Sequence, residues 1–224
     1  MIKSGIEAGN KNGISYLYKD GKKLKYKPWL GDLFSFLYDP IMRKSIFPKK
    51  FEASIESHLQ FLKGEFRDVH NSTIMELATG SGNLSEVMPC DNKYIGIDIS
   101  EGLLKIASRR FTANGFKKPE FYICSAEELP FQDNFFDMCI CNLSLNFFDD
   151  LNSVVKQIKR ILKNKCMFIC SVPVPEKNKK QSVIRGKLYT ESELKSIFID
   201  NGFNYSSYDF ANGAILYFKA ILRD

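Results

Sequence analysis

The sequence predicts an α/β fold, in which a seven-stranded, mostly parallel sheet carries helices on both faces and ends in an antiparallel hairpin. From residue 72, short apolar runs alternate with helical patterns, which is typical of a parallel sheet. A glycine-rich turn follows the first run, and the last two runs flank an Asn-Gly pair, a strong hairpin signal. We expect residues 1–71 to form an N-terminal arm and helical cap, and residues 72–224 the main domain.

The composition is that of an ordinary globular protein. Of the 224 residues, 44% are hydrophobic and 26% charged, which suits one domain with a small appendage. No apolar run approaches the roughly 20 residues of a membrane span, and the first residues lack the apolar core of a signal peptide. Four of the six cysteines lie in apolar strand-like runs, where a thiol packs as a small core residue. We therefore expect a reduced, cytoplasmic protein with no membrane span and no metal site.

The net charge of +6 raises nucleic-acid binding as an alternative. The lysines gather in two short stretches, Lys22–Lys27 and Lys177–Lys180, and neither interleaves with aromatic residues on a defined element. A nucleic-acid surface places basic residues along one face or element. The pattern therefore favours solvated loops.

The N-terminal region contains the predicted arm and cap. Residues 1–27 are polar with a short apolar alternation, which predicts a flexible arm or a short edge hairpin. Apolar residues then recur at steps of three and four, as in an amphipathic helix, and a proline follows that could open a second helix. The residues are Ile14, Tyr16 and Tyr18 in the arm; Leu30, Leu33, Phe34, Leu37, Tyr38 and Ile41 in the first helix; Pro48, Phe51, Ile55, Leu59 and Leu62 in the second.

Five apolar runs after residue 72 have the length of buried strands. Two helical patterns lie between them, and right-handed crossovers would place such helices over the sheet. The strand runs are Thr73–Leu77, Tyr94–Asp98, Glu120–Cys124, Phe136–Cys141 and Cys166–Val172; the helical patterns are Leu103–Phe111 and Leu151–Leu162.

The C-terminal region departs from this alternation. Thr190 and Glu193 have the spacing of a capping box, so a helix is expected to begin there. Phe203–Phe210 and Ala214–Leu222 then predict two strands joined by a tight turn at residues 211–213.

The turn after the first strand has small residues at Ala78, Gly80 and Gly82. A dinucleotide-binding turn needs them at the first, third and sixth positions, and the sixth position here is Asn83. The missing third glycine disfavours a pyrophosphate, because that glycine lets the helix pack closely beside one. Gly80 and Gly82 still let the backbone approach a compact ligand without phosphates.

Asp98 ends the second strand, and ligands of open α/β sheets bind beyond such strand ends. A carboxylate there can accept hydrogen bonds from both hydroxyls of a ribose, each worth about 1.5–3 kcal/mol. The alternative is an anion at a helix N-terminus, since Ser100-Glu101 follows. The position of Asp98 twenty residues after Ala78 favours the ribose.

Four motifs in order resemble those of class I S-adenosylmethionine-dependent methyltransferases. Glu76–Gly82 resembles the first motif, Ile97–Ser100 the second, Ser125–Phe131 the third, and Arg160–Asn164 the stretch before the fifth strand. The resemblance covers about residues 72–222 and is closest to the ubiquinone/menaquinone-biosynthesis type, which methylates small molecules. It implies a Rossmann-like fold, S-adenosylmethionine as methyl donor and S-adenosylhomocysteine as product.

The resemblance also implies a cofactor site. Glu76 would orient the glycine-rich turn or reach the methionine amino group, Asp98 would hold the ribose, and Ile99 would lie under the adenine. The residues implied at the cofactor are Glu76, Ala78, Thr79, Gly80, Ser81, Gly82, Asp98, Ile99, Leu103, Ser125, Ala126, Glu127, Asn142 and Leu143.

Two positions depart from the family pattern. Ala78 replaces the usual first glycine, which a backbone in the β region tolerates. Ser125 stands where an aspartate commonly meets the adenine amino group, and a hydroxyl accepts that hydrogen bond without charge. We therefore expect somewhat weaker adenine binding.

Methyl transfer from a sulfonium requires alignment and exclusion of water, and a general base only if the acceptor must lose a proton. The segment Asn142–Phe148 follows the fourth strand and lacks the Asn/Asp-Pro-Pro-Tyr motif of methylases that act on nucleic-acid amino groups. His58 is a candidate general base, and the alternative is a histidine packed in the core. Tyr38 could form part of a lid over the cofactor, and the alternative is packing at the end of its helix. His70 lies in a polar linker. The candidate catalytic residues are Tyr38, His58, Asn142 and Asn146.

The sequence therefore predicts an enzyme that methylates a small molecule, apolar or aromatic, by in-line transfer from S-adenosylmethionine. One alternative is an RNA methyltransferase, supported only by the charge. Another is a catalytically silent, cofactor-binding partner protein. The acceptor atom and the oligomeric state, with a homodimer among the options, are left open.

Overall fold

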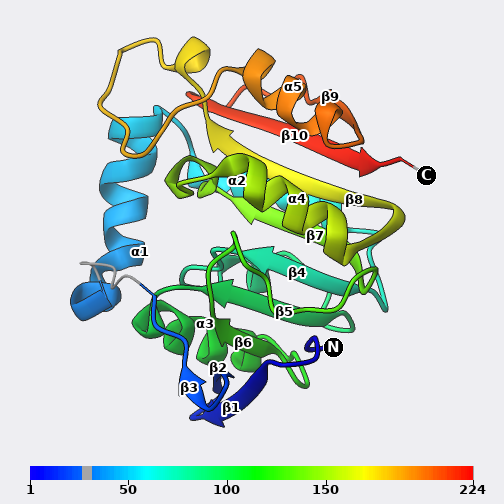
Figure 1. The fold of residues 1–224 in the computed structure, drawn as a ribbon. Helices are drawn as coiled ribbons and strands as arrows, with labels where there is room; N and C mark the ends of the chain where they lie inside the picture. Colours follow the sequence, from blue (N-terminus) through cyan, green and yellow to red (C-terminus); the bar gives the residue numbers. More distant parts are fainter. Residues whose placement is uncertain (27–31, 224) are drawn as a thin grey trace.

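The computed structural model describes residues 1–26 and 32–223, which form one ten-stranded sheet with helices on both faces (Figure 1). The strand order is β1-β2-β6-β5-β4-β7-β8-β10-β9, and β3 pairs with β2. The strands are β1 (Glu7–Lys11), β2 (Ile14–Lys19), β3 (Lys22–Lys23), β4 (Thr73–Leu77), β5 (Lys93–Asp98), β6 (Glu120–Ile123), β7 (Phe136–Asn142), β8 (Leu162–Pro173), β9 (Phe203–Ser207) and β10 (Ile215–Leu222).

The predicted number of seven strands is wrong, because the N-terminal arm adds three strands to the predicted seven. β2 pairs in parallel with β6, and β1 and β3 pair antiparallel with β2. The apolar residues of β2 face both ways: Ile14 is buried among the side chains of one sheet face and Leu17 among those of the other. This two-sided burial makes β2 an integral strand of the sheet, whereas the sequence pattern predicted a flexible arm or a short edge hairpin. The predicted C-terminal hairpin is confirmed, with β10 antiparallel to both β8 and β9.

Four helices cover the sheet, two on each face (Figure 1). α4 (Leu151–Ile161) and α5 (Glu191–Asp200) pack on one face, and α5 begins with the predicted capping box. α2 (Ile55–Phe66) and α3 (Glu101–Ala113) pack on the other. α2, which the sequence assigned to the cap, contacts the sheet core through Leu62 and Phe66. Cys139, Cys141 and Cys170 are buried in the sheet as free thiols.

The segment Asp32–Phe51, called the cap segment below, stands beside the sheet and is not the predicted amphipathic helix (Figure 1). It winds through a 3₁₀ turn η1 (Asp32–Leu37), one α-helical turn α1 (Tyr38–Ile41) and wide π-type turns η2 (Met42–Phe51). Pro48 lies inside η2 and does not open a helix; without an N–H, a proline cannot extend a regular ladder of helical hydrogen bonds. Leu30, the first residue of the predicted helix pattern, lies outside the described residues.

The second predicted helix begins later than expected, at Ile55. Glu52 turns the chain with a left-handed φ of 53°, and the extended Ser54 then caps α2 by accepting a hydrogen bond from the Ser57 N–H at 3.1 Å. Phe47, Phe51 and Ile55 share a small apolar core with Ile215 and Tyr217 of β10. The cap segment is therefore anchored on the antiparallel end of the sheet.

A tight turn is present at the Asn-Gly pair, one residue later than predicted: Asn212 pairs with Ile215, whose N–H donates to the Asn212 carbonyl at 3.2 Å. The predicted bounds of the first strand are wrong, because β9 ends at Ser207, and residues 208–214 form a connection that docks onto the chain before α2. The Asn212 amide accepts the Ser54 N–H at 2.8 Å and donates to the Ser54 carbonyl at 3.0 Å. The Ala214 N–H donates to the Phe51 carbonyl at 2.7 Å. Hydrogen bonds to the cap region thus hold this turn in place.

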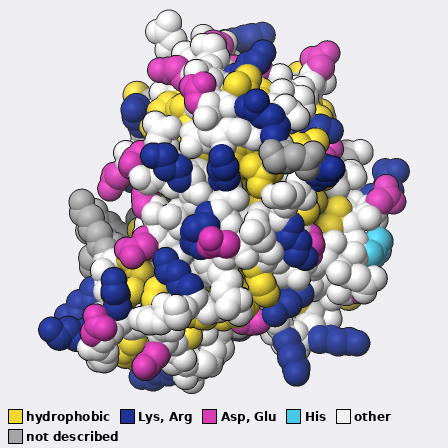
Figure 2. All heavy atoms as spheres, turned by 45° about the vertical axis from the view of Figure 1, so that its right-hand side comes forward, with side chains coloured by type: hydrophobic (Ala, Val, Ile, Leu, Met, Phe, Trp, Pro, Cys, Tyr) yellow, Lys and Arg dark blue, Asp and Glu magenta, His cyan; other side chains and the backbone are white. Residues whose placement is uncertain are grey.

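The face shown in Figure 2 carries Lys and Arg side chains dispersed among acidic and neutral polar groups. No cationic stripe runs across that view. Within residues 1–26 and 32–223, no helix has both the length and the apolar character to cross a bilayer.

The docking of the Asn212 connection can be tested at Gly213. Its φ of 58° is left-handed, and an added Cβ would overlap the Phe51 carbonyl oxygen. Gly21→Ala is the matched control, because Gly21 also has a left-handed φ, 72°, but meets nothing within 4 Å. We expect Gly213→Ala to lower the free energy of unfolding by about 1–3 kcal/mol more than Gly21→Ala, as overpacking does. Urea denaturation measures both, and equal losses would contradict the docking.

Candidate functional site

The candidate site is a pocket at the carboxyl ends of β4 and β7, between the cap segment and the start of α2. The glycine-rich turn Ala78–Gly82 forms its floor. Apolar side chains of the cap segment and α2 form its walls, and the polar lining residues come mainly from the ends of β4 and β7 and from the turn. The polar groups that matter below are those of Tyr38, His58, Glu76 and Asn142.

Glu76, near the end of β4, is only 3% exposed and has polar partners on both neighbouring strands. The Tyr94 hydroxyl of β5 donates to one carboxylate oxygen, and the Asn142 amide of β7 donates to the other at 3.1 Å. The Thr79 hydroxyl lies 3.0 Å from the Tyr94 hydroxyl. Burial raises the pKa of Glu76 to about 7, against the opposing effect of these hydrogen bonds. The carboxyl group can therefore change its protonation near neutral pH.

The glycine-rich turn runs through left-handed conformations at three residues. Gly80 and Gly82 have φ of 57° and 80°, and Ala78 has φ of 50°. The expectation that Ala78 lies in the β region is therefore wrong. The Thr79 N–H reaches across to the Ile97 carbonyl at 2.8 Å, which requires the chain to bend back at Ala78. An added Cβ on Gly82 would lie 2.8 Å from the Ala107 Cα, so glycine is what lets α3 pack against the turn.

Asp98 joins the turn to the end of β5. One carboxylate oxygen accepts the Gly80 N–H and the other accepts the Ser100 N–H, each at 2.9 Å. A carboxylate has about four acceptor positions. It can therefore accept these two backbone N–H groups and hydrogen bonds from a ligand at the same time. The fold thus holds the predicted ribose-binding group in a fixed place beside Gly80.

Beside Asp98 lies an exposed apolar side chain, Ile99, which is 41% accessible. Leu103 of α3 and Ala126 after β6 are buried, so of these three predicted residues Ile99 offers the most open surface. The Ser125 hydroxyl donates to the Glu127 carboxylate and accepts the Glu127 N–H at 3.2 Å. These neighbours order the loop that follows β6, next to the end of β5.

A polar cluster closes the cap segment onto the turn. Asp39 forms an ion pair with Arg110 of α3 at 2.5 Å and accepts a hydrogen bond from the Ser81 hydroxyl at 2.6 Å. Arg110 also donates to the Asn83 side chain. The sequence does not indicate Arg110, because nothing in the pattern of a helix shows which of its basic residues meets a distant carboxylate. We call Asp39, Ser81, Asn83 and Arg110 the latch.

The four catalytic candidates do not all face the pocket. Tyr38, His58 and Asn142 line it, whereas Asn146 is buried elsewhere and holds a loop through its Nδ2, which donates to the Arg185 carbonyl at 2.6 Å. The Tyr38 hydroxyl lies 3.6 Å from where a Cβ on Gly80 would stand, and burial raises the pKa of Tyr38. His58 is 5% exposed, with Nδ1 3.0 Å from the Tyr217 hydroxyl.

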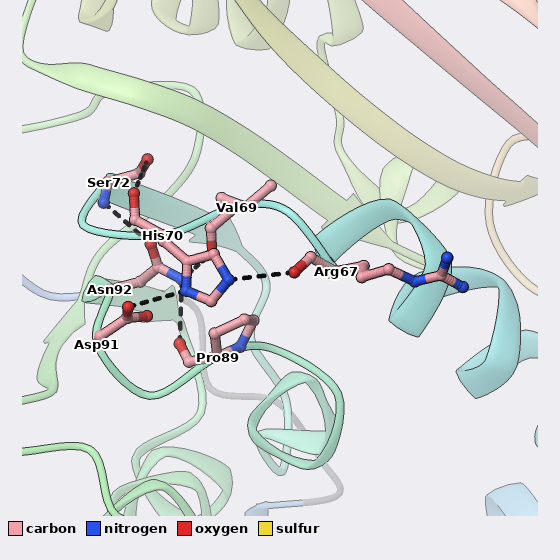
Figure 3. Close-up of polar contacts among 7 residues, drawn as sticks. All are labelled: Arg67, Val69, His70, Ser72, Pro89, Asp91 and Asn92. Atoms are coloured by element: carbon pink, nitrogen blue, oxygen red, sulfur yellow. Dashed lines mark hydrogen bonds and ion pairs between the residues drawn. The ribbon is translucent and has the colours of Figure 1, made fainter.

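His70 lies at the opposite, amino end of β4 (Figure 3). Its ring contacts the Asp91 carboxylate at 2.8 Å and the Arg67 carbonyl at 3.2 Å, and the hydrogen bond to Asp91 raises the pKa of His70. Asn92 bridges the same loops through the Ser72 N–H and the carbonyls of Val69 and Pro89. His70 therefore has a structural setting remote from the pocket.

Comparison with known proteins agrees with this geometry. Residues 75–170, which contain the turn, Asp98 and Asn142, match the family model described as a methyltransferase domain. This part of the chain is therefore similar to a methyltransferase domain. The family uses S-adenosylmethionine as its cofactor.

Two relatives and one solved structure illustrate the similarity of the methyltransferase domain. A ubiquinone/menaquinone biosynthesis C-methyltransferase of Desulfotalea psychrophila is 30% identical over 53% of this chain and 49% of its own length. A demethylmenaquinone methyltransferase of Symbiobacterium thermophilum is 35% identical over 43% of this chain and 41% of its own length. The chain thus matches about half of each relative. A methyltransferase structure from Clostridium acetobutylicum has the same fold, with a TM-score of 0.66 and 18% identity over 86% of this chain and 99% of its own.

Glu76 should make cofactor binding depend on pH. An ammonium group bound nearby would favour the ionised carboxylate and lower the pKa of about 7, so binding would release a proton below that pH. We expect the affinity for S-adenosylhomocysteine to rise as the pH increases from about 5 to 7 and then to level off. Calorimetry at several pH values checks this. Glu76→Gln should remove the rise, and an unchanged profile in that variant would exclude the role.

Proposed function

We propose that this methyltransferase domain binds S-adenosylmethionine across the ends of β4, β5 and β7 and transfers its methyl group to a small, largely apolar acceptor. The observation that supports this most directly is the pocket itself, which joins the glycine-rich turn to an apolar wall. The turn and Glu76 supply the cofactor side. Met42, Phe47, Leu59 and Leu62 supply an apolar side that suits a ring or hydrocarbon.

The residues present fit S-adenosylmethionine. The buried Glu76 carboxyl lines the pocket and suits the methionine amino group, the anchored Asp98 carboxylate suits a ribose, and the exposed Ile99 suits the face of an adenine. The bound cofactor would supply a methyl group already activated on a sulfonium. The protein then has to hold the acceptor in line with that group and exclude water. The cap segment is suited to the second task, because the latch ties it directly over the turn.

The names of the relatives indicate which methyl acceptors to test first. Two of them are named for methylation in ubiquinone and menaquinone biosynthesis, so an oxygenated aromatic ring leads our list of candidate acceptors. RNA is the alternative acceptor, supported only by the net charge of +6. Release of S-adenosylhomocysteine should be measured with quinols, phenols, amines and RNA. Turnover with RNA alone would overturn the small-molecule proposal.

Asp98→Ala tests the cofactor site. Loss of the hydrogen bonds to the ribose should weaken S-adenosylhomocysteine binding at least tenfold, since a hydrogen bond to a charged group contributes about 1.5–3 kcal/mol. Asp91→Ala is the matched control, because it removes a carboxylate at the other end of the strands, where His70 is its partner. Calorimetry compares the two variants. Equal affinities for Asp98→Ala and the unmodified protein would exclude the ribose role.

A further inference from the structure

A chain of hydrogen bonds runs from the backbone before α2 to the apolar side of the pocket, where the methyl acceptor is proposed to bind. It passes from Ser54 through Asn212 and Tyr217 to His58, and the last three side chains are each at least 94% buried. The methyl-transfer scheme above uses none of these groups. Their order of donors and acceptors determines the hydrogen position on His58.

The orientation of the Asn212 amide is set by the backbone of Ser54. Its oxygen must accept the Ser54 N–H at 2.8 Å, and its nitrogen must donate to the Ser54 carbonyl at 3.0 Å. The second hydrogen of that nitrogen then points to the Tyr217 oxygen, 2.9 Å away. Asn212 therefore makes the Tyr217 oxygen an acceptor.

The Tyr217 hydroxyl connects Asn212 to His58. Its oxygen accepts from Asn212, and the Nδ1 of His58 lies 3.0 Å from the same oxygen. The arrangement in which the Tyr217 hydrogen points to Nδ1 pairs both the hydroxyl hydrogen and the Nδ1 lone pair. Burial lowers the pKa of His58 to about 4, so the imidazole is neutral at neutral pH. A neutral imidazole whose Nδ1 accepts a hydrogen bond carries its hydrogen on Nε2.

We propose that His58 presents this Nε2–H to the pocket as a neutral hydrogen-bond donor for an oxygen atom of the methyl acceptor, with Tyr217 and Asn212 as positioning residues. This rests on the proposed function and adds to it a class of acceptor, an apolar molecule that carries a carbonyl or phenolate oxygen. His58 is thereby a specificity residue and not the general base. In this tautomer the Nε2 lone pair is part of the ring π system and cannot take a proton.

The surroundings of His58 support an acceptor with a single polar group. Phe47 packs near the ring, with centroids 5.6 Å apart, and the neighbouring wall residues Ile55, Leu59 and Leu62 are apolar. An oxygen placed among these side chains requires a hydrogen-bond partner, because an unpaired buried acceptor costs about 1–3 kcal/mol. A single donor on an otherwise apolar wall therefore selects an acceptor that carries an oxygen atom, and it also fixes where that oxygen lies.

The tautomer is measured first, by nitrogen NMR on the unmodified protein with labelled histidine. We expect an unprotonated Nδ1 and a protonated Nε2 for His58 across neutral pH, while the exposed His70 serves as internal reference and titrates. Tyr217→Phe removes the donor to Nδ1, so a second tautomer should appear. A protonated Nδ1 on His58 in the unmodified protein would overturn the proposal.

Ligand selectivity is measured with α-tetralone and tetralin, which share a fused-ring frame and differ by one carbonyl oxygen. The ratio of their affinities should fall about three- to tenfold in His58→Phe, as expected for one hydrogen bond. His58→Gln, whose amide nitrogen reaches the Nε2 position, should retain part of the preference. An unchanged ratio in His58→Phe, or no binding of either probe to the unmodified protein, would overturn the proposal.

S-adenosylhomocysteine binding in the same samples separates the two hypotheses. Normal binding with no carbonyl preference removes only the role of His58. Absent binding in the unmodified protein removes the proposed function itself.

Discussion

The structure depends on a carboxyl group buried at the centre of the sheet. Glu76 can occupy this position only because strands on both sides supply hydrogen-bond donors, Tyr94 from β5 and Asn142 from β7. The carboxyl group thereby ties together the ends of three adjacent parallel strands, at the edge where the glycine-rich turn begins. Gly96, opposite Glu76 in β5, leaves room for this network, because a Cβ there would overlap the hydroxyls of Thr79 and Tyr94.

The same arrangement explains how a distant part of the chain completes the pocket. The turn that starts beside Glu76 presents Ser81 to Asp39, and α3 presents Arg110 to the same carboxylate. The Asp39–Arg110 pair is about one quarter exposed, so its net stabilisation is modest, and the hydrogen bonds and packing of the cap segment must add to it. The latch at one end and the Asn212 connection at the other hold the cap segment across the opening.

The sequence predicted the repetitive parts of the fold well, because each local pattern there agreed with the final packing. β4 has its predicted bounds, and α4 buries the predicted apolar residues Leu151, Val154, Val155, Ile158 and Ile161. The family motifs indicated the candidate cofactor residues, and their role stays a prediction. The errors fell where a long-range contact decides the local conformation.

Ala78 and Asn212 show the physical reason for those errors. Ala78 adopts a left-handed φ because Thr79 must reach β5, a demand that the identity of residue 78 does not reveal. Asn212-Gly213 begins a tight turn, but β9 ends before it, and the Asn212 side chain binds both backbone groups of Ser54, 158 residues away. Arg110 and Tyr217 likewise acquire their roles only through tertiary contacts.

The three additional N-terminal strands change the exposed border of the sheet. Without them β6 would be the outermost strand, and its buried residues Phe121 and Tyr122 would lie beside unpaired backbone groups. In the described structure β1 takes that position with the short, fully exposed sequence Glu7–Lys11, which has a charged residue at each end. Short and charged edges are poor templates for strand addition by another chain. The N-terminal hairpin therefore protects the sheet against self-association.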